Sequence, residues 1–270
     1  METGLPLVAT ARLATAIHRG MLPMLMLFIL VPATAATIAS PATAQSASQY
    51  RMVEPADLPL DRPGVWTLHF DYTPVRILTV DTPNQGKKTI WYMVYRVYNT
   101  TDTPQTFYPE FELVTKDPSG EARTYLDEPR PTILEQIRKV EDPTGALNLQ
   151  SSISISKTKI PVTKPDSYPR AVYGVAIWPD VAEKSPDVNR FSVYVSGLSN
   201  GLARAETDTQ QELISRKALQ IDFVRPTDNT RASITDIREN DNAGLGPVKW
   251  IYRPTSLRKM GAPMPPDSGM

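Results

Sequence analysis

The residues that could carry out chemistry are few, and the first candidate is a serine between two glycines. Gly197-Leu198-Ser199-Asn200-Gly201 matches G-x-S-x-G and follows an expected strand, as in the nucleophile elbow of serine hydrolases. Such a serine needs a general base. The chain has two histidines, His18 and His69, and neither follows Ser199, although that fold places its catalytic histidine after the serine. We therefore interpret the motif as a turn in which glycine supplies a positive φ.

Metal-binding patterns are equally sparse. Cysteine is absent and His69 is the one histidine beyond the N-terminal segment, which excludes a multi-histidine or thiolate zinc site. The segment 236–244 is rich in Asp and Asn, but Arg238 and Pro247 occupy ligand positions of the calcium-binding EF-hand pattern. No phosphate-binding or dinucleotide-binding glycine motif is present. We predict no metal and no cofactor.

Paired carboxylates could act on a glycosidic bond. Glu110 and Glu112 share one face of an expected strand, and Asp127 adjoins Glu128 near a turn. A glycosidase holds two carboxyls several ångströms apart across a sugar in a cleft, whereas neighbouring Glu residues on a strand usually face solvent. We predict no catalytic residue, and an enzyme that uses carboxylates from distant positions is the alternative hypothesis.

Aromatic residues near the C-terminus form the one candidate contact site. Trp250 and Tyr252 lie outside the predicted core, beside Lys249 and Arg253. A basic aromatic segment of this kind could contact an anionic envelope polymer or a protein partner. It could also be a terminal strand that folds back on the domain. Lys249, Trp250, Tyr252 and Arg253 are therefore the candidate partner contacts.

Composition excludes several classes of protein. The 270 residues carry 29 Lys and Arg against 29 Asp and Glu, with a pI of about 6.8. That balance excludes a generally basic nucleic-acid binder and an acidic disordered chain. The absence of cysteine excludes disulfides and cysteine nucleophiles.

The first 44 residues have the pattern of a secretory signal peptide. Sparse basic residues precede the apolar run 21–31, and small residues lead to Ala42-Thr43-Ala44, a plausible cleavage site. Ala33-Thr34-Ala35 is an earlier alternative, and an uncleaved anchor formed by residues 21–40 is another. We predict cleavage after Ala44, export to the periplasm, envelope or medium, and no membrane span in the remainder.

Alternating apolar and polar residues dominate the rest of the chain and predict short strands. The segment 89–99 is apolar on both faces, so we expect it to be central in its sheet and Trp91 to be a core residue. Residues 201–217 are interpreted as a long loop with a helical turn near 210–215. The predicted strands are 66–72, 75–80, 89–99, 107–113, 123–126, 151–156, 171–178, 191–195, 219–224 and 248–252.

One helix interrupts the strands. Ile133, Leu134, Ile137 and Val140 recur at helical spacing over 131–141, which starts at a proline and stops before Asp142-Pro143. Many short strands with one helix predict a mainly β chain built as an antiparallel β-sandwich. The predicted organisation is a signal peptide (1–44), a linker (45–63), one sandwich domain (64–226) and an irregular C-terminal extension (227–270).

A resemblance supports this fold class. Small immunoglobulin-like domains of uncharacterised exported bacterial proteins are similar over roughly residues 65–226. The residues that carry the resemblance are Trp91-Tyr92, Val97-Tyr98-Asn99, Phe107, Phe111-Glu112-Leu113, Gly120, Gly174-Val175-Ala176-Ile177 and Phe191-Ser192-Val193-Tyr194-Val195. The resemblance implies an immunoglobulin-like sandwich with an inserted helix at 131–141, and it transfers no catalytic residue.

Together these patterns predict an exported, non-enzymatic envelope protein that acts as a structural or interaction module. Its partner would be an envelope protein or polymer, not a nucleic acid. The alternative is an enzyme acting on polysaccharide, or a carbohydrate-binding accessory protein, that uses carboxylates and aromatic residues. A cleft lined by two carboxyls would favour that alternative.

Overall fold

A computed structural model describes residues 50–83, 86–116, 120–206, 212–226, 237–241, 244 and 246–254. This part of the chain is mainly β, with three helices and antiparallel sheets, so the predicted fold class is confirmed at that level. The predicted signal peptide and residues 45–49 lie outside the described residues.

The first sheet is organised around β4 (Gly86–Tyr98), which contacts β2 and β3 along one edge and β10 along the other. All these pairings are antiparallel. β1 extends the sheet beyond β2, and β8 pairs in parallel with β10. The other strands are β1 (Arg51–Val53), β2 (His69–Tyr72), β3 (Arg76–Thr82), β8 (Gln150–Ser151) and β10 (Val172–Trp178).

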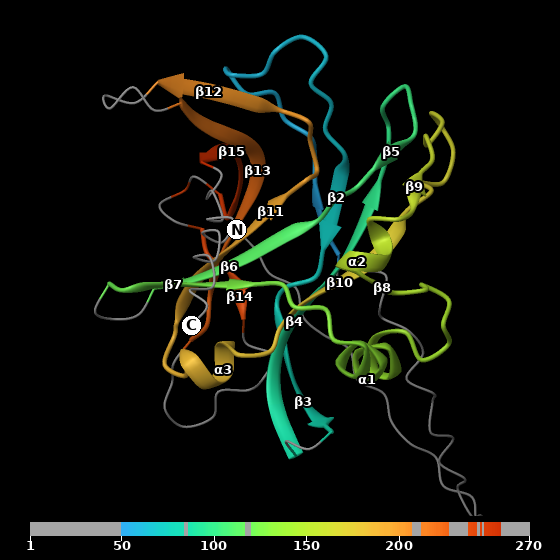
Figure 1. The fold of residues 1–270 in the computed structure, drawn as a ribbon. Coiled ribbons are helices and arrows are strands. Elements are labelled where there is room, and N and C mark those ends of the chain that lie inside the picture. The colour runs from blue at the N-terminus through green and yellow to red at the C-terminus, as the bar shows by residue number, and fades with distance from the viewer. Residues whose placement is uncertain are drawn as a thin grey trace, which may run out of the picture. The chain divides into compact units, whose positions relative to one another are not determined.

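The second sheet is organised around the long strand β13 (Glu212–Val224). β11 and β12 pair with successive parts of β13, β6 and β7 follow beyond β11, and β14 and β15 also pair with β13 (Figure 1). β5 (Gln105–Thr106) and β9 (Lys159–Ile160) form a separate short ladder. The second sheet contains β6 (Glu110–Lys116), β7 (Ala122–Leu126), β11 (Arg190–Ser196), β12 (Leu202–Glu206), β14 (Arg238–Glu239) and β15 (Val248–Pro254).

The main core lies where the two sheets face one another. Alternate residues of β4 point into it, and ring contacts join the sheets: Trp91 meets Phe191 with centroids 5.1 Å apart, and Tyr95 meets Phe111 at 4.7 Å. Trp91 is 1% exposed. The predictions that 89–99 is a central strand and that Trp91 belongs to the core are confirmed.

A second apolar cluster covers the other face of β4. Helix α1 (Pro131–Glu141) has the predicted bounds, with a proline in its first turn, and buries Ile133, Leu134 and Ile137 against this face. Val140, which we expected on the apolar face, is exposed. Glu141 joins the helix to the sheet through hydrogen bonds from Arg76 and from the Tyr92 hydroxyl (2.6 Å). The helix explains why β4 is apolar on both faces.

Residues 151–156, predicted as a strand, are mostly helical. Ser151 accepts a hydrogen bond from the Ser154 amide and caps α2 (Ser152–Ile155). The Ser-Ile alternation imitates the period of a strand, but serine side chains also bond readily to nearby backbone amides at helix starts.

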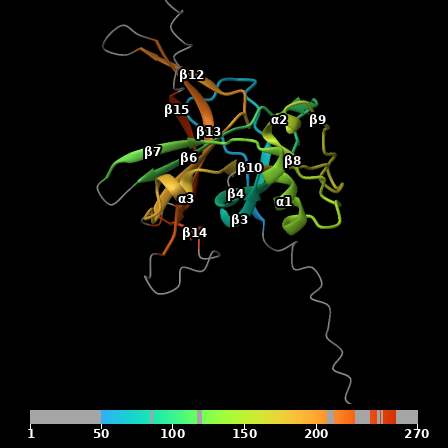
Figure 2. The ribbon, with the colours of Figure 1, turned by 60° about the horizontal axis from the view of Figure 1, so that its bottom comes forward.

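A short helix, α3 (Val181–Lys184), was not predicted. Figure 2 shows α1 and α2 on one side of the strands and α3 apart from them.

The predicted loop at 201–217 is wrong, because this segment contains β12 and the first part of β13. Residues 207–211 lie outside the described residues, and residues 212–215 of the helical turn expected near 210–215 belong to β13. Segments on either side of the predicted domain also contribute to the sheets. The predicted linker supplies β1, and the predicted C-terminal extension supplies β14 and also β15, which contains the strand predicted at 248–252. Long-range pairing of this kind is not visible in local periodicity.

Truncating Trp91 tests the central position of β4. Replacing Trp91 by Ala should lower the free energy of unfolding by about 3–5 kcal/mol, because the change leaves a cavity between the two sheets. Urea denaturation followed by circular dichroism measures this. Tyr168→Ala is the control, since Tyr168 is 93% exposed. Equal denaturation midpoints for Trp91→Ala and the unmodified protein would contradict the assignment.

Candidate functional site

The G-x-S-x-G segment fastens the chain that leads into β2. The Ser199 hydroxyl donates to the Trp66 carbonyl (2.5 Å) and accepts from the Gly201 amide (3.1 Å). The neighbouring Asn200 Oδ1 accepts from the Trp66 amide at 2.8 Å. Ser199 is thus used for backbone contacts, which supports the turn interpretation.

The two glycines of this motif are needed for different reasons. Gly197 has φ +91°, and a Cβ there would lie 2.0 Å from the Tyr108 carbonyl oxygen. Gly201 does not have a positive φ, contrary to our expectation. A Cβ at Gly201 would instead lie 2.8 Å from Tyr252 Oη and 2.9 Å from the Lys217 Cβ.

The four predicted contact residues are divided between the two faces of β15. Trp250 is buried in the main core, and its indole donates to the Glu54 carbonyl at 2.9 Å. The Tyr252 hydroxyl donates to Asp61 at 2.7 Å. Trp250 is therefore a core residue and the half-buried Tyr252 is engaged by Asp61, as expected if a terminal strand folds back on the domain. Lys249 and Arg253 lie on the opposite side of the strand, on the face of the second sheet that points away from the core, which we call the outer face.

Three basic residues line up across one end of the outer face. Lys116 of β6 lies directly opposite Arg190 of β11. Arg190 lies opposite Val224 of β13, and Val224 lies opposite Arg238 of β14. We call Lys116, Arg190 and Arg238 the cationic row. All three are exposed, and none has an ion-pair partner among the residues that the structure describes. Adjacent strands lie about 4.8 Å apart, so the row concentrates positive charge.

A hollow of about 290 Å³ adjoins this row. Its lining includes Lys116, Arg190, Lys249 and the buried Asp222. Burial alone would raise the pKa of Asp222, but hydrogen bonds from Gln220 and Ser192 and the charge of Lys249 lower it overall. The carboxylate stays ionised and holds Lys249 at 3.3 Å. Three cations thus face one carboxylate in the hollow.

Sequence reasoning missed the cationic row. Lys116 and Arg190 flank predicted strands, and Arg238 belongs to the segment examined as a calcium loop. Their outward direction follows from alternation, because each has an inward-facing buried neighbour: Thr115, Phe191 and Ile237. Only the strand register brings the three together.

The carboxylates considered as possible pairs have different partners in the fold. Glu112 forms an ion pair with Arg253, whose guanidinium lies 3.9 Å above the centre of the Tyr194 ring. Glu110 and Asp127, one from each predicted pair, line a common hollow. One hollow is therefore lined by two carboxylates that are far apart in the sequence.

Asp127 joins the two sheets. Its Oδ1 accepts from the Ile177 amide of β10 at 2.8 Å, and its Oδ2 accepts from the Ser152 hydroxyl. The chain crosses from the second sheet to the first here, since the Asp127 amide bonds to Phe111 and the Glu128 amide to Ile177. Burial raises the pKa of Asp127 to about 6, against the lowering effect of these hydrogen bonds.

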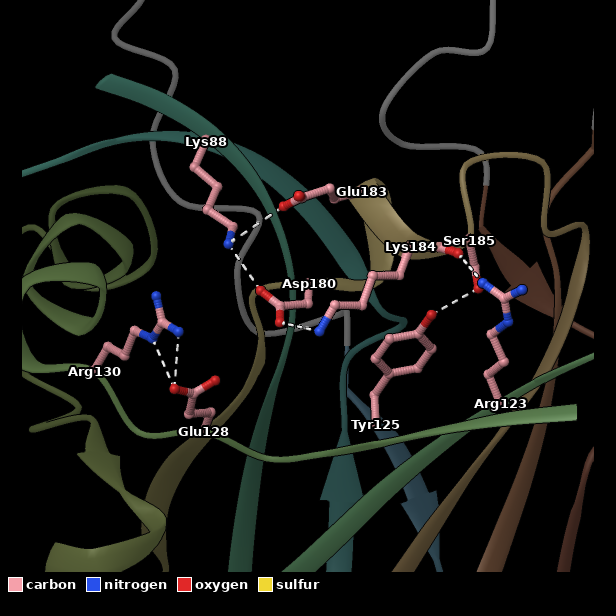
Figure 3. Close-up of polar contacts among 9 residues, drawn as sticks. All are labelled: Lys88, Arg123, Tyr125, Glu128, Arg130, Asp180, Glu183, Lys184 and Ser185. Atoms are coloured by element: carbon pink, nitrogen blue, oxygen red, sulfur yellow. Dashed lines mark hydrogen bonds and ion pairs between the residues drawn. The ribbon is translucent and has the colours of Figure 1, made fainter. Parts of the chain in front are cut away.

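Charged residues between α3, β4 and β7 neutralise one another (Figure 3). Asp180 lies between Lys88 (2.8 Å) and Lys184 (2.7 Å), and the hydrogen bonds from these two lysines lower its pKa to about 2. The Tyr125 and Ser185 hydroxyls lie 2.7 Å apart. These contacts attach α3 to both sheets, and they leave no excess charge comparable with the cationic row.

His69 is a packing residue. Its ring stacks on Tyr98 with centroids 4.6 Å apart, and Nδ1 lies 3.4 Å from Glu54 Oε2. Burial lowers the pKa of His69, and the nearby carboxylates of Glu54 and Asp71 only partly oppose this. The imidazole is therefore mainly neutral at pH 7.

Comparison with protein-family models, curated proteins and solved structures finds no match for the chain.

Within the described ranges, no helix has the length and apolar character needed to cross a membrane. The same residues contain no cluster of three or more His, Asp or Glu that could hold a metal ion. Asp236, Asn242 and Ala243 of the tested calcium segment lie outside the described residues, and Asp241 accepts a turn hydrogen bond from the Gly246 amide (2.9 Å).

Ser199 should be unreactive. Ser199→Ala should lower the free energy of unfolding by no more than about 2 kcal/mol, the cost of lost hydrogen bonds. Gly197→Val should cost more, because the valine would need a strained φ and would collide with the Tyr108 carbonyl. Denaturation midpoints measure both changes. Covalent labelling of Ser199 by a fluorophosphonate probe in the folded protein would contradict the structural role.

Asp127 should make stability depend on pH. Its pKa is raised in the folded state, so the protonated form favours folding below about pH 4, and this contribution is lost as the pH rises through about 6. Asp127→Asn keeps an acceptor for Ile177 and can donate to Ser152 without carrying a charge. The variant should therefore gain up to about 2–3 kcal/mol over the unmodified protein at pH 8, and no such gain at pH 4. A pH-independent difference in urea denaturation would contradict this.

Proposed function

We propose that this chain is an exported, non-catalytic binding module with an immunoglobulin-like sandwich, and that its outer face contacts an anionic polymer of the cell envelope. The observation that carries the proposal is the cationic row of Lys116, Arg190 and Arg238, which are exposed and unpaired within the described part of the chain. Export is supported by the signal-peptide pattern of residues 1–44.

The energetic character of the row supports a binding role. Like charges directly opposite one another on adjacent strands destabilise a sheet, and Lys116 and Arg190 are in that position. An anionic partner would relieve this repulsion and would gain electrostatic attraction. Elsewhere on the same face, Arg253 is matched by Glu112 and Lys249 by Asp222.

The positions of the candidate catalytic groups favour a binding module over an enzyme. Ser199 is engaged with the backbone of Trp66 and Gly201, and both carboxylate oxygens of Asp127 accept hydrogen bonds from the fold itself. His69 is packed against Tyr98. The enzyme alternative draws on one observation, namely that Glu110 and Asp127 line the same hollow.

Charge removal tests the proposal. A triple variant with Lys116→Gln, Arg190→Gln and Arg238→Gln should bind polygalacturonate at low salt about tenfold or more weakly, because three exposed charge contacts are lost. The matched control changes three other exposed lysines, Lys157, Lys159 and Lys164, to Gln. Both variants have the same net charge.

Affinity electrophoresis across a range of salt concentrations measures the binding, since screening should weaken it in the unmodified protein and less so in the triple variant. Equal losses in both triple variants would indicate attraction by net charge alone. That result, or the absence of polyanion binding by the unmodified protein, would contradict the proposal.

A further inference from the structure

A second hollow lies at the other end of the outer face. It has a volume of about 550 Å³, within the range of small-molecule sites, and is formed by the start of β6, the end of β7 and α2. We call it the Tyr108 hollow. Glu110, which lines it, is six residues from Lys116 along β6, so the hollow and the cationic row lie about 20 Å apart.

Three large hydrophobic side chains line the Tyr108 hollow and are open to solvent. Tyr108 is 68% exposed, and Leu126 and Ile153 are also large hydrophobic residues left open to solvent. A cluster of this kind around a hollow is typical of a binding site. The backbone of Tyr108 is held in place, because Gly197 packs directly against its carbonyl oxygen.

Two charged residues of opposite sign line the same hollow without pairing. Glu110 and Arg216 have no ion pair with each other or with any other described residue. The neighbouring pair shows the contrast. Arg253 is the register partner of Arg216, and Glu112 lies two residues from Glu110, yet Arg253 and Glu112 do form an ion pair. Among the described residues, the hollow therefore presents a carboxylate acceptor and a guanidinium donor that have no ion-pair partner.

We propose that the Tyr108 hollow binds a sugar ring of a polysaccharide. The apolar C–H face of the ring would lie on the exposed Tyr108 side chain. Ring hydroxyls, which both donate and accept, would bond to Glu110 and Arg216 at once, and hydrogen bonds to charged groups are stronger than those between neutral groups. A zwitterionic peptide would instead depend on two exposed ion pairs, which contribute little.

This inference rests on the proposed function in naming the envelope polymer as a polysaccharide, but the site is independent of the cationic row. The test is therefore made with neutral ligands. Isothermal titration calorimetry would measure binding of neutral trisaccharides of glucose, galactose, mannose, xylose and N-acetylglucosamine to the purified protein, with the tripeptide Lys-Leu-Glu as the competing class.

Tyr108→Ala should lower the affinity for the bound trisaccharide at least tenfold. Tyr108→Phe should keep the affinity within about threefold, because the aromatic ring on which the sugar would lie is retained. Glu110→Gln and Arg216→Gln should each weaken binding. Tyr168→Ala, which removes an exposed tyrosine elsewhere, and the triple variant of the cationic row should bind as the unmodified protein does.

Each result decides between the two proposals. Binding of none of the five trisaccharides, binding that Tyr108→Ala leaves unchanged, or preference for the tripeptide would overturn the sugar site. If polygalacturonate binding still depends on the cationic row, the proposed function stands without the sugar site. Trisaccharide binding that depends on Tyr108 would establish the sugar site even if the cationic row did not contribute to polygalacturonate binding. Circular dichroism of each variant would confirm that it is folded.

Discussion

The fold depends on one buried charge, the ammonium group of Lys217. This side chain is 1% exposed in the interior of β13, 2.6 Å from Asp61 Oδ2 and 5.7 Å from the centre of the Trp250 ring. Asp61 also accepts hydrogen bonds from the Tyr252 hydroxyl (2.7 Å) and the Leu58 amide (2.9 Å). A buried charge without a partner is strongly destabilising. The segment before β2, the middle of β13 and β15 must therefore assemble together.

This constraint determines what β15 can present to a partner. With Trp250 and Tyr252 turned inward to the Lys217 site, alternation along the strand sends Lys249 and Arg253 to the outer face. The inward half of β15 stabilises the domain, and the outward half joins the surface that carries the cationic row. A basic aromatic segment thus serves two separate purposes, one for each face.

The outer face is not uniform. Its middle is neutralised by the Glu112–Arg253 and Asp222–Lys249 pairs. Its ends carry groups without partners in the described chain: the cationic row at one end, and Glu110 and Arg216 at the other. Repulsion within the row is unfavourable for the sheet, so the row does not stabilise the fold, and this is the ground for the proposed binding role. Under the two proposals, the cationic row would contact the charged groups of a polymer and the Tyr108 hollow would contact its sugar rings.

The sequence alone determined the features that depend on local periodicity: the mainly β class, the two apolar faces of the strand containing Trp91, and the helix at 131–141. These follow from the repeat of apolar residues every two or every 3.6 positions. Only the tertiary structure decided that Lys217 is buried, that residues 202–206 pair with 212–216, and that residues 116, 190 and 238 form one row. Strand register joins residues far apart in the chain, and alternation specifies the face of a residue but not its neighbours across the sheet.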